Sequence, residues 1–242
     1  MKPYIFGHRG ASGYEIENTI IAFKKAVSMK AGIESDVQLT KDNKLICFHD
    51  PIFMNGLNYY RVSSLTYKEI GEIKFKDNRK IPLVEEVFKI FKESSINLRY
   101  SFDMINKNAG LRLLNLAQDA GILENIEFTD RRFFLLSFLR KQSKKANLVY
   151  TLAEFIKTIS DKTINLERLR RLNIRVMNIR CNKNQECLFK DVVDHGFKCS
   201  IWGVNTKIDM KRIIKMKYND EIVHAIYTDY PDILINLINE HF

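Results

Sequence analysis

The sequence predicts a (β/α)8 TIM barrel, an α/β fold, formed by residues 1–242 as a single domain. Short β-rich runs alternate with stretches of helical periodicity along the whole chain, a pattern typical of parallel strands joined by helices. The chain is 45% apolar with 10 glycines and 4 prolines, which suits a globular protein with a full core. The alternative that the same alternation allows is an open, doubly wound sheet.

Eight segments are predicted to be strands, and eight strand–helix units are the number that a closed barrel needs. The segments are residues 4–8, 32–36, 98–103, 125–129, 147–151, 174–179, 198–204 and 225–228. The first helix is expected to follow Asn18 as its cap, because Ile20, Phe23, Ala26 and Val27 recur at helical spacing after it.

Residues 51–82 are the main departure from regular alternation. They contain Tyr59 and Tyr60 and a helical-looking stretch over residues 67–73. We expect this segment to be a short excursion after the hairpin of the second strand, lying over the barrel mouth and forming no second domain.

Charge and apolar runs limit the classes of partner. A net charge of +10 favours nucleic acid, an acidic membrane surface or a phosphate-bearing substrate. The basic clusters 131–132 and 168–171 lack a nucleic-acid motif, so no nucleic-acid partner is expected.

Apolar runs such as 133–139 are too short to cross a bilayer, and the amino terminus lacks a signal-peptide pattern. Peripheral membrane contact and the oligomeric state stay open.

The four cysteines do not form a disulfide framework or show C-x-x-C spacing. We expect reduced thiols and a cytoplasmic location. Cys47 lies two residues before His49, but one such pair is weak evidence for zinc, and Cys47 is interpreted as a small core residue.

Chemistry-bearing residues gather in the first fifty positions, where His8 and Arg9 precede the pair Glu34 and Asp36, and His49 follows. Side chains two apart on a strand share a face, so the two carboxylates repel each other unless a cation or a proton lies between them. A hard divalent metal is one solution to this repulsion.

A hairpin connects the carboxylates to the second histidine. Asp42 and Asn43 are turn residues between two extended runs, and folding about them returns His49 opposite Glu34. In a barrel, this site would lie at the carboxyl-terminal rim, where catalytic residues gather.

The order of these motifs resembles the signature of the glycerophosphodiester phosphodiesterase family. The resemblance covers essentially the whole chain. It is carried by His8-Arg9-Gly10, Glu17-Asn18-Thr19, Glu34-x-Asp36-Val37-Gln38-Leu39-Thr40-Lys41-Asp42, His49-Asp50, Ile81-Pro82-Leu83-Val84-Glu85-Glu86-Val87, Trp202-Gly203-Val204-Asn205 and Thr228-Asp229-Tyr230-Pro231.

The resemblance implies a barrel enzyme that hydrolyses glycerophosphodiesters to glycerol 3-phosphate and an alcohol with a divalent cation, Ca2+ or Mg2+. It implies that His8 and His49 are the acid/base pair, that Arg9 binds phosphate, and that Glu34 and Asp36 are metal ligands. These roles agree with the chemistry of the groups, since imidazole titrates near neutrality and guanidinium offers paired donors to phosphoryl oxygens.

The family's third metal ligand is a carboxylate on the next strand, usually within Glu-x-Lys, and this sequence departs from that pattern. Asp103 is the preferred match, because alternation along residues 98–103 places Ser101 and Asp103 inward. The rival alignment uses residues 97–99 and replaces the carboxylate by the amide of Asn97. With Asp103, the usual lysine becomes Ile105, unless Lys107 or another base supplies the charge.

Several residues have two interpretations. Trp202 either packs against a substrate glycerol or is structural, and Asp229 either supports the rim or contacts His8. Asp50 is a turn acceptor or orients the adjacent histidine. For residues 17–19, helix capping and mouth architecture are favoured over chemistry.

Two other functions compete with glycerophosphodiester hydrolysis. One is hydrolysis of a lysophospholipid or another phosphodiester on the same fold, which an apolar lip in residues 51–82 would favour. The other is non-catalytic binding of a phosphodiester, which the altered third-strand motif would favour.

Overall fold

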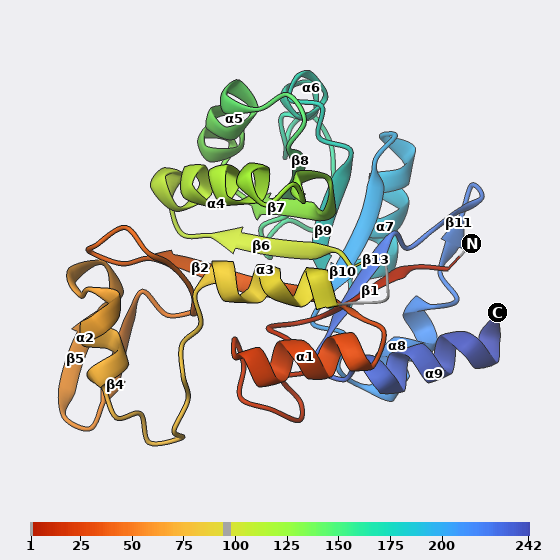
Figure 1. The fold of residues 1–242 in the computed structure, drawn as a ribbon. Coiled ribbons are helices and arrows are strands. Elements are labelled where there is room, and N and C mark those ends of the chain that lie inside the picture. Colours follow the sequence, from red (N-terminus) through yellow and green to blue (C-terminus); the bar gives the residue numbers. More distant parts are fainter. Residues whose placement is uncertain (1, 94–97) are drawn as a thin grey trace.

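The structure, a computed structural model, describes residues 2–93 and 98–242, and its centre is a barrel of parallel strands (Figure 1). The barrel closes because β1 pairs with both β2 and β13, with Phe6 opposite Gly32 at the first seam. This closure confirms the predicted fold class and excludes the open sheet. The barrel strands are β1 (Tyr4–Gly7), β2 (Gly32–Leu39), β6 (Tyr100–Met104), β7 (Ile126–Asp130), β8 (Asn147–Thr151), β9 (Val176–Arg180), β10 (Lys198–Trp202) and β13 (Ala225–Thr228).

Helices cover the outside of the barrel, and buried apolar side chains such as Ile33 and Leu113 fill the layer between them and the strands. The helices are α1 (Ile20–Ser28), α3 (Val84–Glu93), α4 (Lys107–Asp119), α5 (Phe133–Gln142), α6 (Leu166–Arg171), α7 (Gln185–Asp194), α8 (Lys207–Ile213) and α9 (Pro231–His241), with a 3-10 turn at Leu123–Asn125. A two-strand hairpin, β11 (Lys217–Tyr218) and β12 (Glu221–Ile222), precedes β13.

The structure corrects the expectation that Asn18 is the amino-terminal cap of α1. Thr19 is the cap, because its side chain accepts a hydrogen bond from the backbone N–H of Ala22. Asn18 lies one residue earlier with a left-handed backbone (φ 55°), which turns its amide toward the barrel mouth. There it donates to Asp36 at 3.2 Å and accepts from Ser35 at 2.6 Å.

Residues 51–82 follow the predicted hairpin, in which β3 (Leu45–Cys47) pairs antiparallel with β2. The segment contains β4 (Ile52–Asn55), β5 (Asn58–Arg61), a 3-10 turn at Val62–Ser64 and α2 (Tyr67–Glu72). It packs on a small apolar cluster of its own, around Phe53. Figure 1 shows it on the side to which the carboxyl end of β6 points.

No helix within residues 2–93 and 98–242 combines the length and apolar character needed to cross a membrane. The four cysteines are free thiols, and Cys47 is fully buried in the core.

Candidate active site

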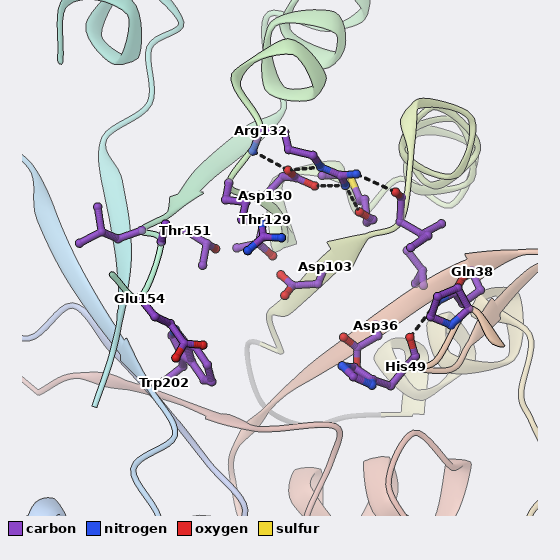
Figure 2. A pocket seen from close by; sticks show the side chains of 17 residues that line it. Asp36, Gln38, His49, Asp103, Thr129, Asp130, Arg132, Thr151, Glu154 and Trp202 are labelled. Atoms are coloured by element: carbon purple, nitrogen blue, oxygen red, sulfur yellow. Dashed lines mark hydrogen bonds and ion pairs between the residues drawn. The ribbon is translucent and has the colours of Figure 1, made fainter. Parts of the chain in front are cut away.

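Two adjoining cavities lie at the carboxyl ends of the barrel strands. The smaller has a volume of about 160 Å³ and is lined by both histidines and the acidic residues of the first motifs. The larger, of about 470 Å³, extends outward past β7 and β8 (Figure 2). Asp36, His49, Asp103 and Trp202 line both cavities, so the two form one continuous site, which we call the mouth pocket.

Three carboxylates converge in the mouth pocket. Glu34 and Asp36 are alternate residues of β2, and Asp103 lies beside Asp36 on β6. One oxygen from each lies within 4.8 Å of the others. This geometry and the all-oxygen donor set fit a hard divalent cation such as Ca2+ or Mg2+.

Two of these carboxyl groups, Glu34 and Asp103, have raised pKa values, as expected where buried negative charges lie close together. Burial raises the pKa of Glu34 to about 8; the His8 charge opposes this rise, and the charges of Asp36 and Asp103 add to it. Desolvation among the strand ends and the charge of Asp36 raise the pKa of Asp103 to about 6, although its side chain also opens to the pocket. A bound cation would remove this repulsion.

The inward position of Asp103 follows from alternation along β6. Tyr100 and Phe102 point outward, and their rings lie 5.6 and 6.1 Å from that of Phe88 on α3. Ser101 points inward, 3.2 Å from the hydroxyl of Tyr227. The rival ligand Asn97 lies outside the described residues.

His8 follows β1 and is held by a carboxylate on the far side of the ring. Its Nδ1 lies 2.8 Å from Asp229, which also accepts from Ser12 at 3.1 Å and from Asn205 at 2.5 Å. The Nε2 atom therefore faces Glu34, at 4.0 Å. Burial alone lowers the pKa of His8, but the Asp229 hydrogen bond and the Glu34 charge outweigh it and raise the pKa to about 9.

His49 is returned to the mouth pocket by the β2–β3 hairpin, as the sequence predicts. The backbone N–H of Phe48 donates to the carbonyl of Asp36, and the Gln38 amide donates to the His49 carbonyl at 2.8 Å. Figure 2 shows His49 beside Asp36. Its Nδ1 lies 2.7 Å from Asp50, so this histidine, like His8, has Nδ1 occupied by a carboxylate.

Arg9 has a left-handed backbone (φ 55°), which lets its N–H donate to Glu34 at 2.8 Å. Its guanidinium is held by Glu17, which accepts from Nη1 at 2.7 Å, and by Asp36, 3.0 Å from Nε. Glu17 therefore positions the arginine at the mouth, which agrees with mouth architecture and not with helix capping.

Asp130 and Arg132 at the end of β7 are site residues that sequence reasoning missed. Asp130 accepts two hydrogen bonds from the Arg132 guanidinium, at 2.8 and 2.6 Å. Arg132 also donates to the carbonyls of Met104 and Ile105, at 2.7 and 3.0 Å. It therefore fixes the end of β6 directly after Asp103. Their position in the sequence could have identified them, because both residues follow the carboxyl end of a predicted strand, where the site residues of a barrel gather.

Lys107 does not take the place of the family lysine in this geometry. Its ammonium lies 5.5 and 5.6 Å from the ring centroids of Phe134 and Phe138 on α5. The basic residues that line the larger cavity, within the described part of the chain, are Arg131 and Arg132, besides His49.

Trp202 has features of both of its interpretations. The Arg180 guanidinium lies 5.2 Å from the centroid of its ring, a packing contact. Its indole Nε1 is buried without a hydrogen-bond partner among the described residues, although the ring lines both cavities. An unpaired donor at a pocket wall can bind a ligand oxygen.

We expect the metal-free protein to lose stability as pH rises from about 6 to about 9. Glu34, Asp103 and His8 all have raised pKa values, so the folded state holds protons that the unfolded state releases. The stabilisation from these groups is present at low pH and is lost as pH passes through the folded pKa values. A cation competes with the same protons, so the rise in Tm on adding Mg2+ or Ca2+ should increase with pH.

Thermal unfolding with EDTA and with each cation, from pH 6 to pH 9, measures this dependence. Glu34→Gln should flatten both the pH slope and the cation effect. An unchanged slope in that variant would contradict the assignment of the effect to this cluster.

Comparisons with known proteins identify the family and agree with the fold. The model of the Glycerophosphoryl diester phosphodiesterase family matches residues 8–233. A glycerophosphodiester phosphodiesterase of Caldanaerobacter subterraneus is 29% identical over 99% of both chains. A solved glycerophosphodiester phosphodiesterase of Thermotoga maritima has a TM-score of 0.76 at 22% identity, covering 98% of this chain and 99% of its own. A phosphodiesterase of Oleispira antarctica, solved with its product sn-glycerol-3-phosphate, has a TM-score of 0.77 at 17% identity, covering 98% of this chain and 97% of its own.

Proposed function

Since the chain belongs to the glycerophosphoryl diester phosphodiesterase family, we propose that its mouth pocket hydrolyses glycerophosphodiesters to glycerol 3-phosphate and an alcohol. The observation that carries this proposal is the shared cavity that His8, His49 and Arg9 line with the three carboxylates. Phosphodiester hydrolysis needs a base, an acid and positive charge around one phosphate, and this cavity offers all three.

The two histidines are suited to opposite proton transfers. One imidazole removes a proton from the nucleophile, which is water or a hydroxyl of the substrate itself. The other donates a proton to the alcohol oxygen as its bond to phosphorus breaks. Asp229 and Asp50 each hold the Nδ1 atom of their histidine, at 2.8 and 2.7 Å, so Nε2 is the atom presented for proton transfer.

Positive charge at the phosphate comes from two sources in this proposal. Glu34, Asp36 and Asp103 would hold a divalent cation, Ca2+ or Mg2+. When bound, this cation would neutralise negative charge on the phosphoryl oxygens. Arg9 supplies a second positive charge for the phosphoryl oxygens, because Glu17 and Asp36 hold its guanidinium at the pocket. Trp202 lies at the wall where the glycerol would pack.

The proposal is tested by incubating purified protein with glycerophosphocholine, glycerophosphoethanolamine or lysophosphatidylcholine in the presence of Mg2+, Ca2+ or Mn2+. Release of glycerol 3-phosphate from the first two substrates is the expected result. Binding of these compounds without turnover under every cation would contradict hydrolysis and would favour a phosphodiester-binding protein.

Lysophospholipid hydrolysis is a second candidate because one observation favours it. Ile52, Met54, Leu57 and Tyr59 in the segment beyond β3 are exposed. An apolar surface near the mouth pocket suits a substrate with an acyl chain. Faster turnover of lysophosphatidylcholine than of glycerophosphocholine would establish this alternative.

Restoring the missing lysine is expected to raise activity. Ile105 lines the larger cavity directly beyond Asp103, and a cation there would stabilise the charge that develops on the phosphate. We expect Ile105→Lys to increase kcat/KM for glycerophosphocholine by about tenfold, less than the roughly 10²–10³-fold of a preorganised electrostatic group, because the new side chain has no partners that hold it in place. Steady-state kinetics at saturating cation measures it.

Lys107→Ala is the matched control and should be almost silent, because the Lys107 ammonium lies over Phe134 and Phe138. A large loss from Lys107→Ala, together with no gain from Ile105→Lys, would mean that Lys107 reaches the phosphate in the substrate complex.

A further inference from the structure

The β4–β5 hairpin packs on the protein with one face and exposes the other. Ile52 pairs with Arg61 and Met54 with Tyr59 across the two strands. Directly paired residues of an antiparallel ladder share a face, so these four side chains point the same way. Phe53 and its partner Tyr60 point the other way.

The inner face is anchored by aromatic packing. The Phe53 ring lies 5.1 Å from that of Phe48 and 5.5 Å from that of Phe75, and Tyr60 stacks on Phe53 at 5.4 Å. The Asn55 amide also donates to the carbonyl of Lys74 at 2.9 Å. The hairpin is therefore held in place, and its outer face is presented to the surroundings in a defined orientation.

The outer face and the tip of the hairpin carry large apolar side chains that the protein leaves uncovered. The exposed fractions are 45% for Ile52, 59% for Met54, 73% for Tyr59 and 95% for Leu57. Leu57 stands in the turn, next to Gly56, whose positive φ of 65° closes it. Apolar side chains clustered in this way are typical of an interaction surface.

Positive charge lies on this apolar face and elsewhere in the same segment. Arg61 lies on the face itself, and Lys74 and Lys76 flank Phe75, the ring against which the hairpin packs. Residues 51–82 contain six lysines and arginines against three acidic residues, in a chain of net charge +10. An apolar tip on a segment with an excess of basic residues complements the two layers of an anionic lipid surface, its headgroups and its acyl chains.

We propose that the β4–β5 hairpin docks the protein on an anionic phospholipid surface, with Leu57 and Met54 entering the boundary between headgroups and acyl chains. Arg61, on the same face of the hairpin, contacts the phosphate groups of the lipids. Pro51, which lines the mouth pocket, directly precedes β4, so docking would hold the edge of that pocket close to the lipid surface.

A lipid surface fits this hairpin better than a protein partner does. A stable protein interface covers about 800 Å² on each partner. The hairpin instead offers a two-stranded ribbon whose most exposed large apolar side chain, Leu57, is at its tip. Insertion of such a tip into lipid requires no complementary groove.

The test is sedimentation with vesicles of phosphatidylcholine alone and of an equimolar mixture of phosphatidylcholine and phosphatidylglycerol. The parent protein should bind the mixed vesicles, and binding should weaken as salt is raised. Leu57→Asp should lower the partition coefficient by at least about tenfold, since it removes one inserted apolar side chain and adds a negative charge. Arg61→Gln should lower it by about fivefold, as expected for one basic residue near an anionic surface.

Ile208→Asp is the matched control, because Ile208 on α8 is 80% exposed and lies outside the hairpin. It should bind as the parent does. Leu57→Asp should also keep the parental rate on water-soluble glycerophosphocholine, so that loss of docking and loss of hydrolysis are measured separately.

Three outcomes would overturn the proposal. The parent protein fails to bind the mixed vesicles, or Leu57→Asp binds them as the parent does. In the third outcome, the parent protein binds neither kind of vesicle, and light scattering shows that it is a dimer which Leu57→Asp dissociates. That result would mean that a second copy of the chain covers this face.

Discussion

Replacing His8 or His49 by alanine is expected to lower kcat on glycerophosphocholine by roughly 10²–10⁴-fold, the contribution of a positioned general acid or base. Each variant loses the Nε2 atom that faces the mouth pocket and the contact between Nδ1 and its carboxylate, Asp229 or Asp50. Because the two rings serve opposite proton transfers in the proposed reaction, each single variant should be impaired. Rates of glycerol 3-phosphate release at saturating cation measure the effect.

His195→Ala is the control for this prediction. His195 directly follows α7 as its carboxyl-terminal cap, with its Nδ1 2.8 Å from the carbonyl oxygen of Asp191, and it does not line the mouth pocket. It should keep the parental rate. Near-parental rates for both His8→Ala and His49→Ala would refute acid/base catalysis by this pair.

Removal of divalent cations with EDTA is expected to abolish activity, and adding back Mg2+, Ca2+ or Mn2+ should restore it. Asp103→Asn should weaken cation binding, because it replaces one of the three carboxylates whose oxygens lie within 4.8 Å of each other. The variant should therefore need a higher cation concentration for half-maximal rate. Loss of a group that only positions a metal ligand typically lowers metal affinity by about 10–100-fold, so loss of a ligand should lower it at least as much.

Glu167→Gln controls for a general effect of removing a negative charge. Glu167 lies on α6 in an exposed pair with Arg171, and its removal should leave the cation dependence unchanged. Full activity of EDTA-treated, metal-free protein would contradict the proposed metal site. An Asp103→Asn variant with parental cation dependence would show that the third ligand was assigned to the wrong residue.

The sequence by itself determined those features that depend on neighbours along the chain. The predicted strand at residues 225–228 coincides with β13, because period-two alternation and flanking turns are local signals. The shared face of Glu34 and Asp36 is equally local, since residues two apart on any strand point the same way. The return of His49 was predictable because the turn around Asp42 and Asn43 is short.

Contacts between residues far apart in the chain were decided only by the tertiary structure. Asp229 lies 221 residues after His8, and the competing interpretations of Asp229 could not be separated until barrel closure placed β13 beside β1. The Arg132 bonds to the carbonyls after Asp103 arise in the same way, because β6 and β7 are neighbours in the sheet.

The orientation of the β4–β5 hairpin also required the fold. Residues 52–54 are all apolar, so alternation cannot show which side chain is buried. Packing against Phe48 and Phe75 selects Phe53 for the interior and leaves Ile52 and Met54 outside. Local periodicity thus specifies that neighbouring side chains point to opposite faces, but only the partner surface, contributed by distant residues, decides which face is covered.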